Sequence, residues 1–287
     1  MTESLPPHDV VTQAVEYLRA RLPARPAVGI ILGSGLGSFA ERPPILAAIP
    51  YADIPGFPVC SVEGHAGRLV LTEREGACVA ILQGRAHRYE GVALATVTHP
   101  VAVLAALGVR TLIVTCAAGS LDEAEAGTLM LIEDHLNLMG DNPLMRTGPA
   151  KGAPAGRSGI RVSGFVEMAQ AYDPALLEIA EQVAGASGLS IRRGVLAAVA
   201  GPTYETAAEA EMLRRLGAQA VSMSVVPEVI VARALKLRVL GLALITNRSG
   251  AALDGRVGHP QVVAVAESRA DSVAALLDGL LRRLASA

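Results

Sequence analysis

Short runs of Val, Ile and Leu alternate along the chain with longer segments whose apolar residues recur every three or four positions. The first pattern is typical of strands buried on both faces, and the second of helices with one apolar side. The sequence therefore predicts strands at 27–32, 78–82, 111–115, 194–200, 220–223 and 239–246, and helices at 11–21, 94–107, 174–186, 206–216, 227–235 and 260–284.

This alternation predicts an α/β fold with a central mixed, mostly parallel β-sheet flanked by helices. Pro174, Pro227 and Pro260 each suit the first turn of a predicted helix, where a missing N–H costs nothing. We expect one domain over residues 1–287. Segment 146–164 is rich in Gly, Pro, Ala and Arg and lacks an apolar period, so it is either a solvated linker or, as we prefer, a flexible flap over a site.

Composition narrows the class of protein. Hydrophobic residues make up 51% of the chain but aromatic residues only 3%, so aliphatic packing must carry the core. Charged residues make up 18%, below the usual share of about 25%, which indicates that part of the surface is buried in an oligomer. The net charge is −2 and no basic stripe is interleaved with aromatics, which argues against a nucleic-acid partner.

Cysteine usage and the N-terminus indicate the compartment. The three cysteines, at 60, 78 and 116, show no CxxC spacing and are typical of reduced thiols rather than of a disulfide frame or a zinc site. Residues 1–10 lack a basic segment followed by an apolar one. Charged residues interrupt the longest apolar stretches before they reach a membrane-spanning length. We expect a cytoplasmic protein with no membrane partner and no metal.

The first candidate motif is GSGLGS at 33–38, which follows a predicted strand. Glycines let successive N–H groups point at an anion, and the Ser34 hydroxyl adds a donor. The register Gly35-x-Gly37 also fits a dinucleotide fingerprint and keeps an NAD-dependent dehydrogenase as an alternative. That fingerprint needs a full helix next, and the Pro pair at 43–44 stops one after two turns, so the sequence favours a phosphate loop.

Two more strand ends carry candidate residues. In GRAHRYEG at 84–91, strand alternation places Arg85 and His87 on one face, and a guanidinium beside an imidazole suits a phosphate. An exposed polar loop is the equal alternative. In TCAAGS at 115–120 the small residues favour a tight packing turn on spacing alone, although ligands in such sheets gather at the carboxyl ends of strands.

The remaining candidates lie in GPTYET at 201–206, VSMS at 221–224 and ITN at 245–247. Glu205 is either a site carboxylate or an acid at a helix N-terminus. Met223 could be core and Asn247 a strand cap. Likewise His65 could be an ordinary loop residue and His259 a helix cap. Taken together, polar residues end nearly every predicted strand, which indicates a site at that edge of the sheet.

Taken in order, these motifs resemble those of a known family. GSGLG, EGHAG, GRAHRYEG, TCAAGSL, GPTYET, VSMSVVPEVIVAR and ITN match, in order and at similar spacing, the blocks of the trimeric purine nucleoside phosphorylases, from residue 28 to the final helix. The resemblance implies phosphorolysis of 6-oxopurine (deoxy)nucleosides such as inosine and guanosine to free base and (deoxy)ribose 1-phosphate, in purine salvage. It implies inorganic phosphate as co-substrate, no cofactor, and a homotrimer.

The resemblance also implies a role for each matching residue. Asn247, Glu205 and His87 would carry the catalysis. Phosphate would be held by Ser34, Arg85, His87, Ser224 and the backbone N–H of Ala117, with His65 near the phosphate entrance. The ribose would contact Tyr89, Met223 and His259, together with Phe165 inserted from a neighbouring subunit. The purine would contact Tyr204, Glu205, Val221 and Asn247.

Departures from the family and rival functions remain. Cys116 stands where the family commonly has Asn, Tyr204 stands where animal enzymes have Phe, segment 146–164 aligns poorly, and the loop at 248–258 is shorter than in animal relatives.

A methylthioadenosine or methylthioinosine phosphorylase is the nearest alternative, but such enzymes favour an acid at the position of Asn247 and an apolar residue near His259. A serine hydrolase lacks support because no GxSxG elbow occurs. NAD titration would test the dehydrogenase alternative.

Overall fold

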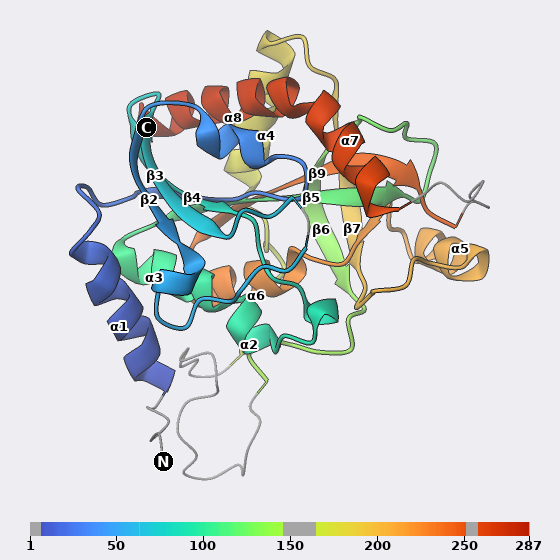
Figure 1. Cartoon of the computed structure of the whole chain (residues 1–287). Helices are drawn as coiled ribbons and strands as arrows, with labels where there is room; N and C mark the ends of the chain where they lie inside the picture. The colour runs from blue at the N-terminus through green and yellow to red at the C-terminus, as the bar shows by residue number, and fades with distance from the viewer. Residues whose placement is uncertain (1–6, 63, 146–164, 251–257, 287) are drawn as a thin grey trace.

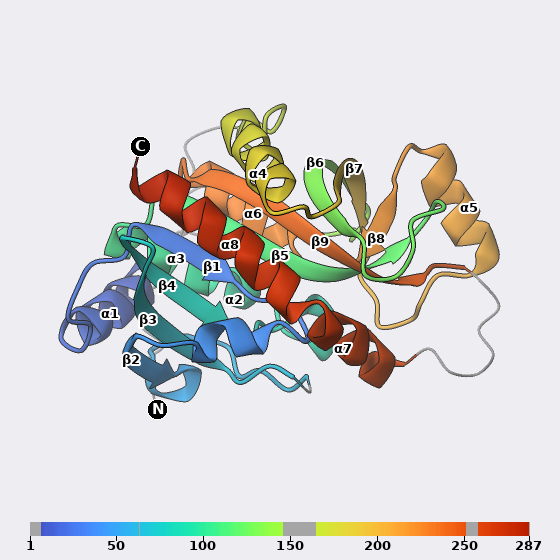
Figure 2. The same cartoon turned by 90° about the horizontal axis from the view of Figure 1, so that it is seen from above.

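The computed structural model describes residues 7–62, 64–145, 165–250 and 258–286, and these form a twisted sheet between two layers of helices (Figure 1; Figure 2). The strands are β1 (Val28–Ile31), β2 (Ile45–Pro50), β3 (Arg68–Arg74), β4 (Ala77–Gln83), β5 (Thr111–Ser120), β6 (Leu129–Asn137), β7 (Ile191–Ala198), β8 (Ala220–Ser222) and β9 (Arg238–Arg248). The α-helices are α1 (Pro7–Arg19), α2 (Leu94–Val97), α3 (His99–Leu107), α4 (Pro174–Ala186), α5 (Ala207–Arg215), α6 (Val226–Ala234), α7 (His259–Ser268) and α8 (Ala270–Ala285), and the short 3₁₀ turns are η1 (Gly37–Glu41), η2 (Tyr51–Asp53) and η3 (Arg88–Glu90).

The nine described strands form one mixed sheet in the order β2-β3-β4-β1-β5-β8-β7-β6-β9. Strands β4, β1, β5 and β9 run parallel, whereas β2–β3, β3–β4, β5–β8 and β6–β9 are antiparallel pairs. Because β5 also pairs with β9, strands β5, β8, β7, β6 and β9 close into a ring. The predicted α/β class, a mixed sheet with flanking helices, is confirmed.

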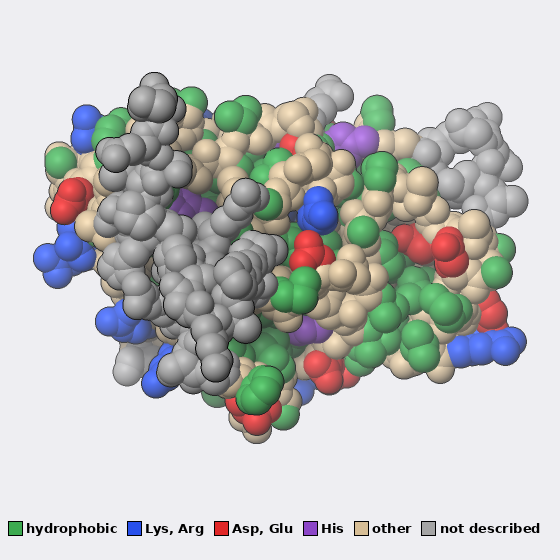
Figure 3. Space-filling view, turned by 90° about the horizontal axis from the view of Figure 1, so that it is seen from below, with side chains coloured by type: hydrophobic (Ala, Val, Ile, Leu, Met, Phe, Trp, Pro, Cys, Tyr) green, Lys and Arg blue, Asp and Glu red, His purple; other side chains and the backbone are tan. Residues whose placement is uncertain are grey.

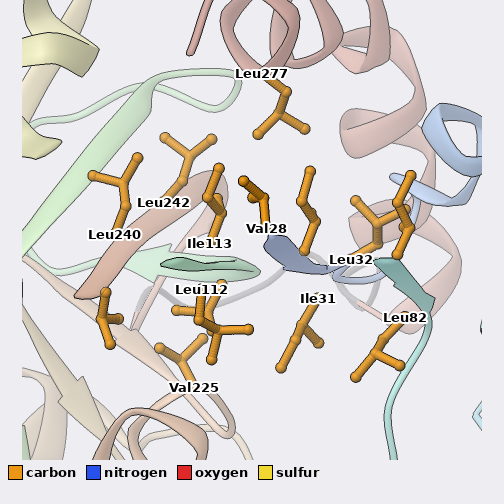
Figure 4. Close-up of a cluster of buried hydrophobic side chains, with 14 of the residues drawn as sticks. Val28, Ile31, Leu32, Leu82, Leu112, Ile113, Val225, Leu240, Leu242 and Leu277 are labelled. Carbon is orange, nitrogen blue, oxygen red and sulfur yellow. The ribbon is translucent and has the colours of Figure 1, made fainter. Parts of the chain in front are cut away.

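Aliphatic side chains fill both sides of the sheet. Helices α4, α7 and α8 cover one face, and α1, α2, α3 and α6 cover the other (Figure 1). Figure 4 shows Ile113, Leu240 and Leu242 directed toward Leu277 of α8, while Leu112 projects to the opposite face. These five side chains are buried. Burial on both faces explains why the central strands consist of uninterrupted apolar runs.

The six predicted strands correspond to β1, β4, β5, β7, β8 and β9, but the sequence did not reveal β2, β3 and β6. β2 consists of apolar residues, ILAAIP, but lies at the sheet edge with most of them exposed, so it is not the doubly buried strand that such a run predicts. Both long predicted helices are divided. The first breaks at Thr98, whose Oγ1 donates to the Leu94 carbonyl over 2.8 Å, and the second breaks at Arg269.

The described surface also bears on the kind of partner. Over the visible part of one face, acidic and basic side chains are interspersed among apolar and neutral ones (Figure 3). None of the described helices is both long and apolar enough to cross a bilayer. The predicted flap at 146–164 lies outside the described residues.

Candidate active site

The carboxyl ends of β1, β5, β8 and β9 and the segments that follow β4 and β7 surround one cavity, whose empty space is about 690 Å³ when the part open to solvent is included. Of the fourteen residues that the sequence and the family resemblance singled out, all except His65 and Phe165 line it. They are Ser34, Arg85, His87, Tyr89, Ala117, Tyr204, Glu205, Val221, Met223, Ser224, Asn247 and His259. The strand ends therefore do converge on a single cavity.

An irregularity between β5 and β9 shapes the floor of this cavity. Ala118 pairs with Ile245, but Gly119 pairs with Asn247, so Thr246 is an extra residue on β9. Such a bulge re-aims the side chains beside it. Thr246 and Asn247, although adjacent on a strand, both line the cavity.

His65 connects two of the predicted phosphate residues from beside the cavity. Its Nδ1 accepts the backbone N–H of Arg85 over 3.0 Å, and its Nε2 lies 3.0 Å from the Ser34 Oγ. Burial lowers the pKa of His65 to about 3, and the charges of His87, Arg85 and His259 act in the same direction. His65 is therefore neutral, with Nε2–H donating to Ser34, and the Ser34 hydroxyl keeps its own proton for a ligand.

Gly84 makes this arrangement possible. Its φ is +104°, and a Cβ at this position would lie 2.6 Å from the Cβ of His65. A glycine is needed both for the backbone angle and for the close approach of the histidine.

His87 is oriented by Glu90, a residue that the sequence analysis did not single out. The His87 backbone N–H and its Nδ1 lie 2.6 and 2.8 Å from Glu90 Oε1, and the ring stacks on Tyr89 with centroids 4.7 Å apart. Burial and the charge of Arg85 lower the pKa of His87, although Glu90 offsets part of the effect. The neutral ring donates Nδ1–H to Glu90 and leaves Nε2 as an acceptor.

Arg85 is almost completely buried. Its Nη1 donates to the Thr115 carbonyl over 2.7 Å, and its Nε lies 2.9 Å from Glu228 Oε1. The side chains of Arg85 and Glu228 are 4% and 2% exposed. The neighbouring Cys116, also on the cavity wall, has a pKa raised to about 11 by burial and is a neutral thiol.

Ser224 lies at a strained turn. Val225 has φ +74° and ψ −56°, and the Val226 N–H donates to the Ser224 carbonyl over 2.9 Å, which is a classic γ-turn. A β-branched residue at positive φ is costly and persists only where the surrounding structure enforces it. The Val225 side chain is fully buried, and this packing holds Ser224 at the cavity wall.

The purine end of the predicted site contains two polar pairs. The Ser249 hydroxyl donates to Glu205 Oε2. Thr246 Oγ1 donates to Asn247 Oδ1 over 2.9 Å. Glu205 directly precedes Thr206, the N-cap of α5, so its carboxylate lies at the helix N-terminus and also lines the cavity.

The residues predicted to hold ribose divide into two groups. Tyr89, Met223 and His259 line the cavity, with His259 at the first position of α7. Phe165 is fully exposed, at 107%, and does not line the cavity of its own chain. Burial raises the pKa of Tyr89 to about 12, so its hydroxyl stays protonated.

Four residues that contact the predicted ones were missed: Glu90, Glu228, Thr246 and Ser249. Glu228 carried a usable signal, because it is the single acid in the apolar run VPEVIVA, and a buried acid needs a partner. Glu90 and Ser249 lie in polar segments where nothing distinguishes them.

Two alternative sites lack the geometry they require. The Gly35–Gly37 loop leads into the five-residue turn η1, and the next strand, β2, pairs antiparallel with β3, so the βαβ unit of a dinucleotide site is not formed there. Within the described residues no group of three or more His, Cys, Asp or Glu side chains is placed to hold a metal ion.

The chain is similar to known proteins along most of its length. The model of the phosphorylase superfamily matches residues 27–282. Purine nucleoside phosphorylase 1 of Geobacillus stearothermophilus is 45% identical over 276 residues, covering 96% of this chain and 97% of that protein. The purine nucleoside phosphorylase of Rattus norvegicus is 45% identical over 239 residues, covering 82% and 81%. The crystal structure of Schistosoma mansoni purine nucleoside phosphorylase in complex with inosine has a TM-score of 0.86 at 32% identity, covering 98% of this chain and 99% of that one.

Proposed function

The chain belongs to the phosphorylase superfamily, among the purine nucleoside phosphorylases, and from this premise we propose that it splits 6-oxopurine nucleosides with inorganic phosphate. The products are the free purine and (deoxy)ribose 1-phosphate. One observation carries the proposal: an anion-binding group and a purine-binding pair line the same cavity. Arg85, His87 and Ser224 form the first, and Glu205 and Asn247 the second.

Phosphate is held on the Arg85 side of the cavity. Ser34, Ser224 and the Ala117 N–H supply donors, and Arg85 supplies a fixed charge. His87, with Nδ1–H committed to Glu90, presents Nε2 as an acceptor for a hydrogen bond from the hydroxyl of hydrogen phosphate. The unprotonated oxygens of the dianion are then free to face the sugar. No cofactor enters this scheme.

The reaction replaces one bond at the sugar. A phosphate oxygen forms a bond to C1′ while the C1′–N9 bond breaks, and the electron pair of that bond stays on the purine. The proton of hydrogen phosphate ends on the purine, so charge and atoms balance. Catalysis requires that the separated charges be favoured over the bound substrate. Asn247 would pair with N7 as it gains a proton, and the phosphate dianion stabilises the cationic sugar.

Specificity follows from donors and acceptors. Inosine and guanosine present an N1–H to the Glu205 carboxylate, whereas adenosine presents a bare lone pair at N1. A carboxylate that the bound base covers and that faces a lone pair loses its partner, and such mismatches cost factors of about 10⁴. The Ser249 hydroxyl holds Glu205 Oε2, which leaves Oε1 to accept N1–H. The enzyme would therefore prefer 6-oxopurines.

The second subunit is part of the proposal. Phe165 is fully exposed and absent from the cavity of its own chain, which supports its insertion into a neighbouring site. We accordingly propose a homotrimer in which each ribose pocket is completed by the neighbouring subunit.

An assay of the full-length protein tests the function. Inosine is incubated with and without phosphate, and xanthine oxidase reports the hypoxanthine released. We expect hypoxanthine to form only with phosphate and at a rate that saturates with it. Inosine left intact at high phosphate, or equal cleavage without phosphate, would contradict the proposal.

A further inference from the structure

The ion pair behind the phosphate pocket has a role of its own. Arg85 and Glu228 are among the most buried charged side chains described, and their Nε and Oε1 atoms lie 2.9 Å apart. Within the described residues, Glu228 accepts no hydrogen bond at either oxygen, and Arg85 Nη2 has no partner. Each charge is thus compensated mainly by the other.

Two of the three guanidinium nitrogens have neighbours in the protein. Nη1 donates to the Thr115 carbonyl over 2.7 Å, and Nε faces Glu228. These two contacts fix the plane of the group, because a guanidinium is rigid and flat. Nη2 is left as the donor available to an anion in the cavity that Arg85 lines.

Glu228 itself stays away from the substrate. It does not line the active-site cavity but borders two small pockets, one shared with Arg85 and the other with His87 and Ser224. It lies in the first turn of α6, four residues after Ser224. Glu228 therefore acts on phosphate indirectly, with Arg85 as the group that its carboxylate faces at 2.9 Å.

We infer that Glu228 is the resident counter-ion of Arg85, a positioning residue that stabilises the phosphate-free site and weakens phosphate binding by competing for the same charge. The inference rests on the proposed function, because it takes phosphate as the anion of the cavity. A buried guanidinium without a counter-ion is strongly unfavourable. Without the Glu228 charge only phosphate would compensate Arg85, so the free protein loses more stability than the bound one. By linkage, phosphate then binds more tightly.

The substitution Glu228→Gln isolates this effect. Glutamine keeps the shape of the side chain but removes the charge. We expect a lower Tm in phosphate-free buffer, a larger rise of Tm on adding phosphate, and a phosphate Kd that falls at least about fivefold in calorimetric titration. The KM for inosine at saturating phosphate should change less than twofold. An unchanged or higher phosphate Kd would overturn the inference.

Asp278→Asn is the matched control. It removes the charge of a different partly buried ion pair, in which Asp278 Oδ1 lies 2.9 Å from Arg74 Nε, away from the cavity lining. This variant should also lose Tm, but its phosphate Kd should equal that of the unsubstituted protein. A tighter phosphate Kd in both variants would show that general destabilisation is responsible, and would also overturn the inference.

A double variant covers the case in which Glu228→Gln does not fold. Removing both charges, in Arg85→Gln with Glu228→Gln, eliminates the uncompensated guanidinium and should recover a folded protein that no longer responds to phosphate. If the double variant is no more stable than the single one, the counter-ion role is wrong. The proposed function fails separately, if the unsubstituted protein itself shows neither phosphate binding nor phosphate-dependent cleavage of inosine.

Discussion

At the scale of single residues, the site is built from pairs in which one side chain fixes another. Glu90 orients His87, His65 orients Ser34, and Ser249 holds Glu205. In each pair the oriented residue keeps one atom for a ligand. This atom is a ring nitrogen of His87, the hydroxyl proton of Ser34 or a carboxylate oxygen of Glu205. This is the arrangement that a preorganised site needs, since the groups are oriented before the reaction begins.

The carboxylate at the purine end can be tested by Glu205→Ala. This change removes the acceptor for N1–H, so kcat/KM for inosine should fall at least about a hundredfold. The phosphate Kd should be unchanged, because Glu205 belongs to the opposite end of the cavity. Steady-state kinetics and calorimetry give the two quantities. Ser249→Ala is the milder comparison, and a large loss of phosphate affinity in Glu205→Ala would require a different substrate pose.

Asn247→Asp should change the preference between bases. A carboxyl group can protonate or accept at positions where the amide cannot, so activity on adenosine should rise relative to inosine. The ratio of the two kcat/KM values, measured at one phosphate concentration, provides the check. A ratio equal to that of the unsubstituted protein would argue against contact between Asn247 and the purine.

Acid should destabilise the fold through His65. Its pKa is lowered to about 3, against about 6.5 in an unfolded chain, so the unfolded state binds the proton first. The stabilisation is complete above about pH 6.5 and is lost as the pH falls from there toward 3. In thermal unfolding between pH 7 and pH 4, His65→Gln should lose less Tm than the unsubstituted protein. Parallel pH profiles for the two proteins would contradict this.

At the scale of elements, two irregularities place functional groups that regular structure would have turned away. The bulge at Thr246 brings it and Asn247 to one cavity, and the γ-turn at Val225 starts α6 directly after Ser224. The apolar runs of β1, β5 and β9 were predictable because burial on both faces leaves a plain pattern. The bulge and the γ-turn were not, since register depends on the partner strand and strain on the surrounding packing.

The N-terminus of α5 provides a test at this scale. The Thr206 side chain accepts the Glu209 N–H and the Glu209 carboxylate accepts the Thr206 N–H, directly after Glu205. Thr206→Ala should cost about 1 kcal/mol of unfolding free energy, measured by urea denaturation. Thr206→Ser keeps the hydroxyl and should restore most of the loss. Equal stability of the Ala and Ser variants would mean that the capping box contributes nothing.

At the scale of the whole molecule, the strand ends of one sheet supply nearly every candidate residue, and this much followed from the sequence. Twelve of the cavity-lining residues were predicted, most of them because they lie at or just after strand ends and match the family blocks. Their partners Glu228 and Ser249 were not, because a contact between α6 and the segment after β4 is visible only in three dimensions. Phe165 is exposed in its own chain, so its proposed contact with ribose would have to be made in a neighbouring subunit.

Mixed oligomers test whether Phe165 completes the pocket of a neighbouring subunit. Phe165→Ala should raise the KM for inosine while leaving the phosphate Kd unchanged. When Phe165→Ala and Glu205→Ala chains are unfolded together and refolded, some intact sites should form from a Phe165→Ala subunit beside a neighbour that still carries Phe165. Activity of the mixture above the sum of the two separate variants is the expected result. Strict additivity would contradict the shared pocket.

The central claim is that phosphate and nucleoside meet in one cavity and react with each other. Phosphorus NMR of the full-length protein with inosine and phosphate tests this most directly, because it follows the phosphorus atom itself. We predict that a phosphate monoester signal grows in equal amount to the hypoxanthine released. Hypoxanthine that accumulates with free ribose and no such signal would contradict the account.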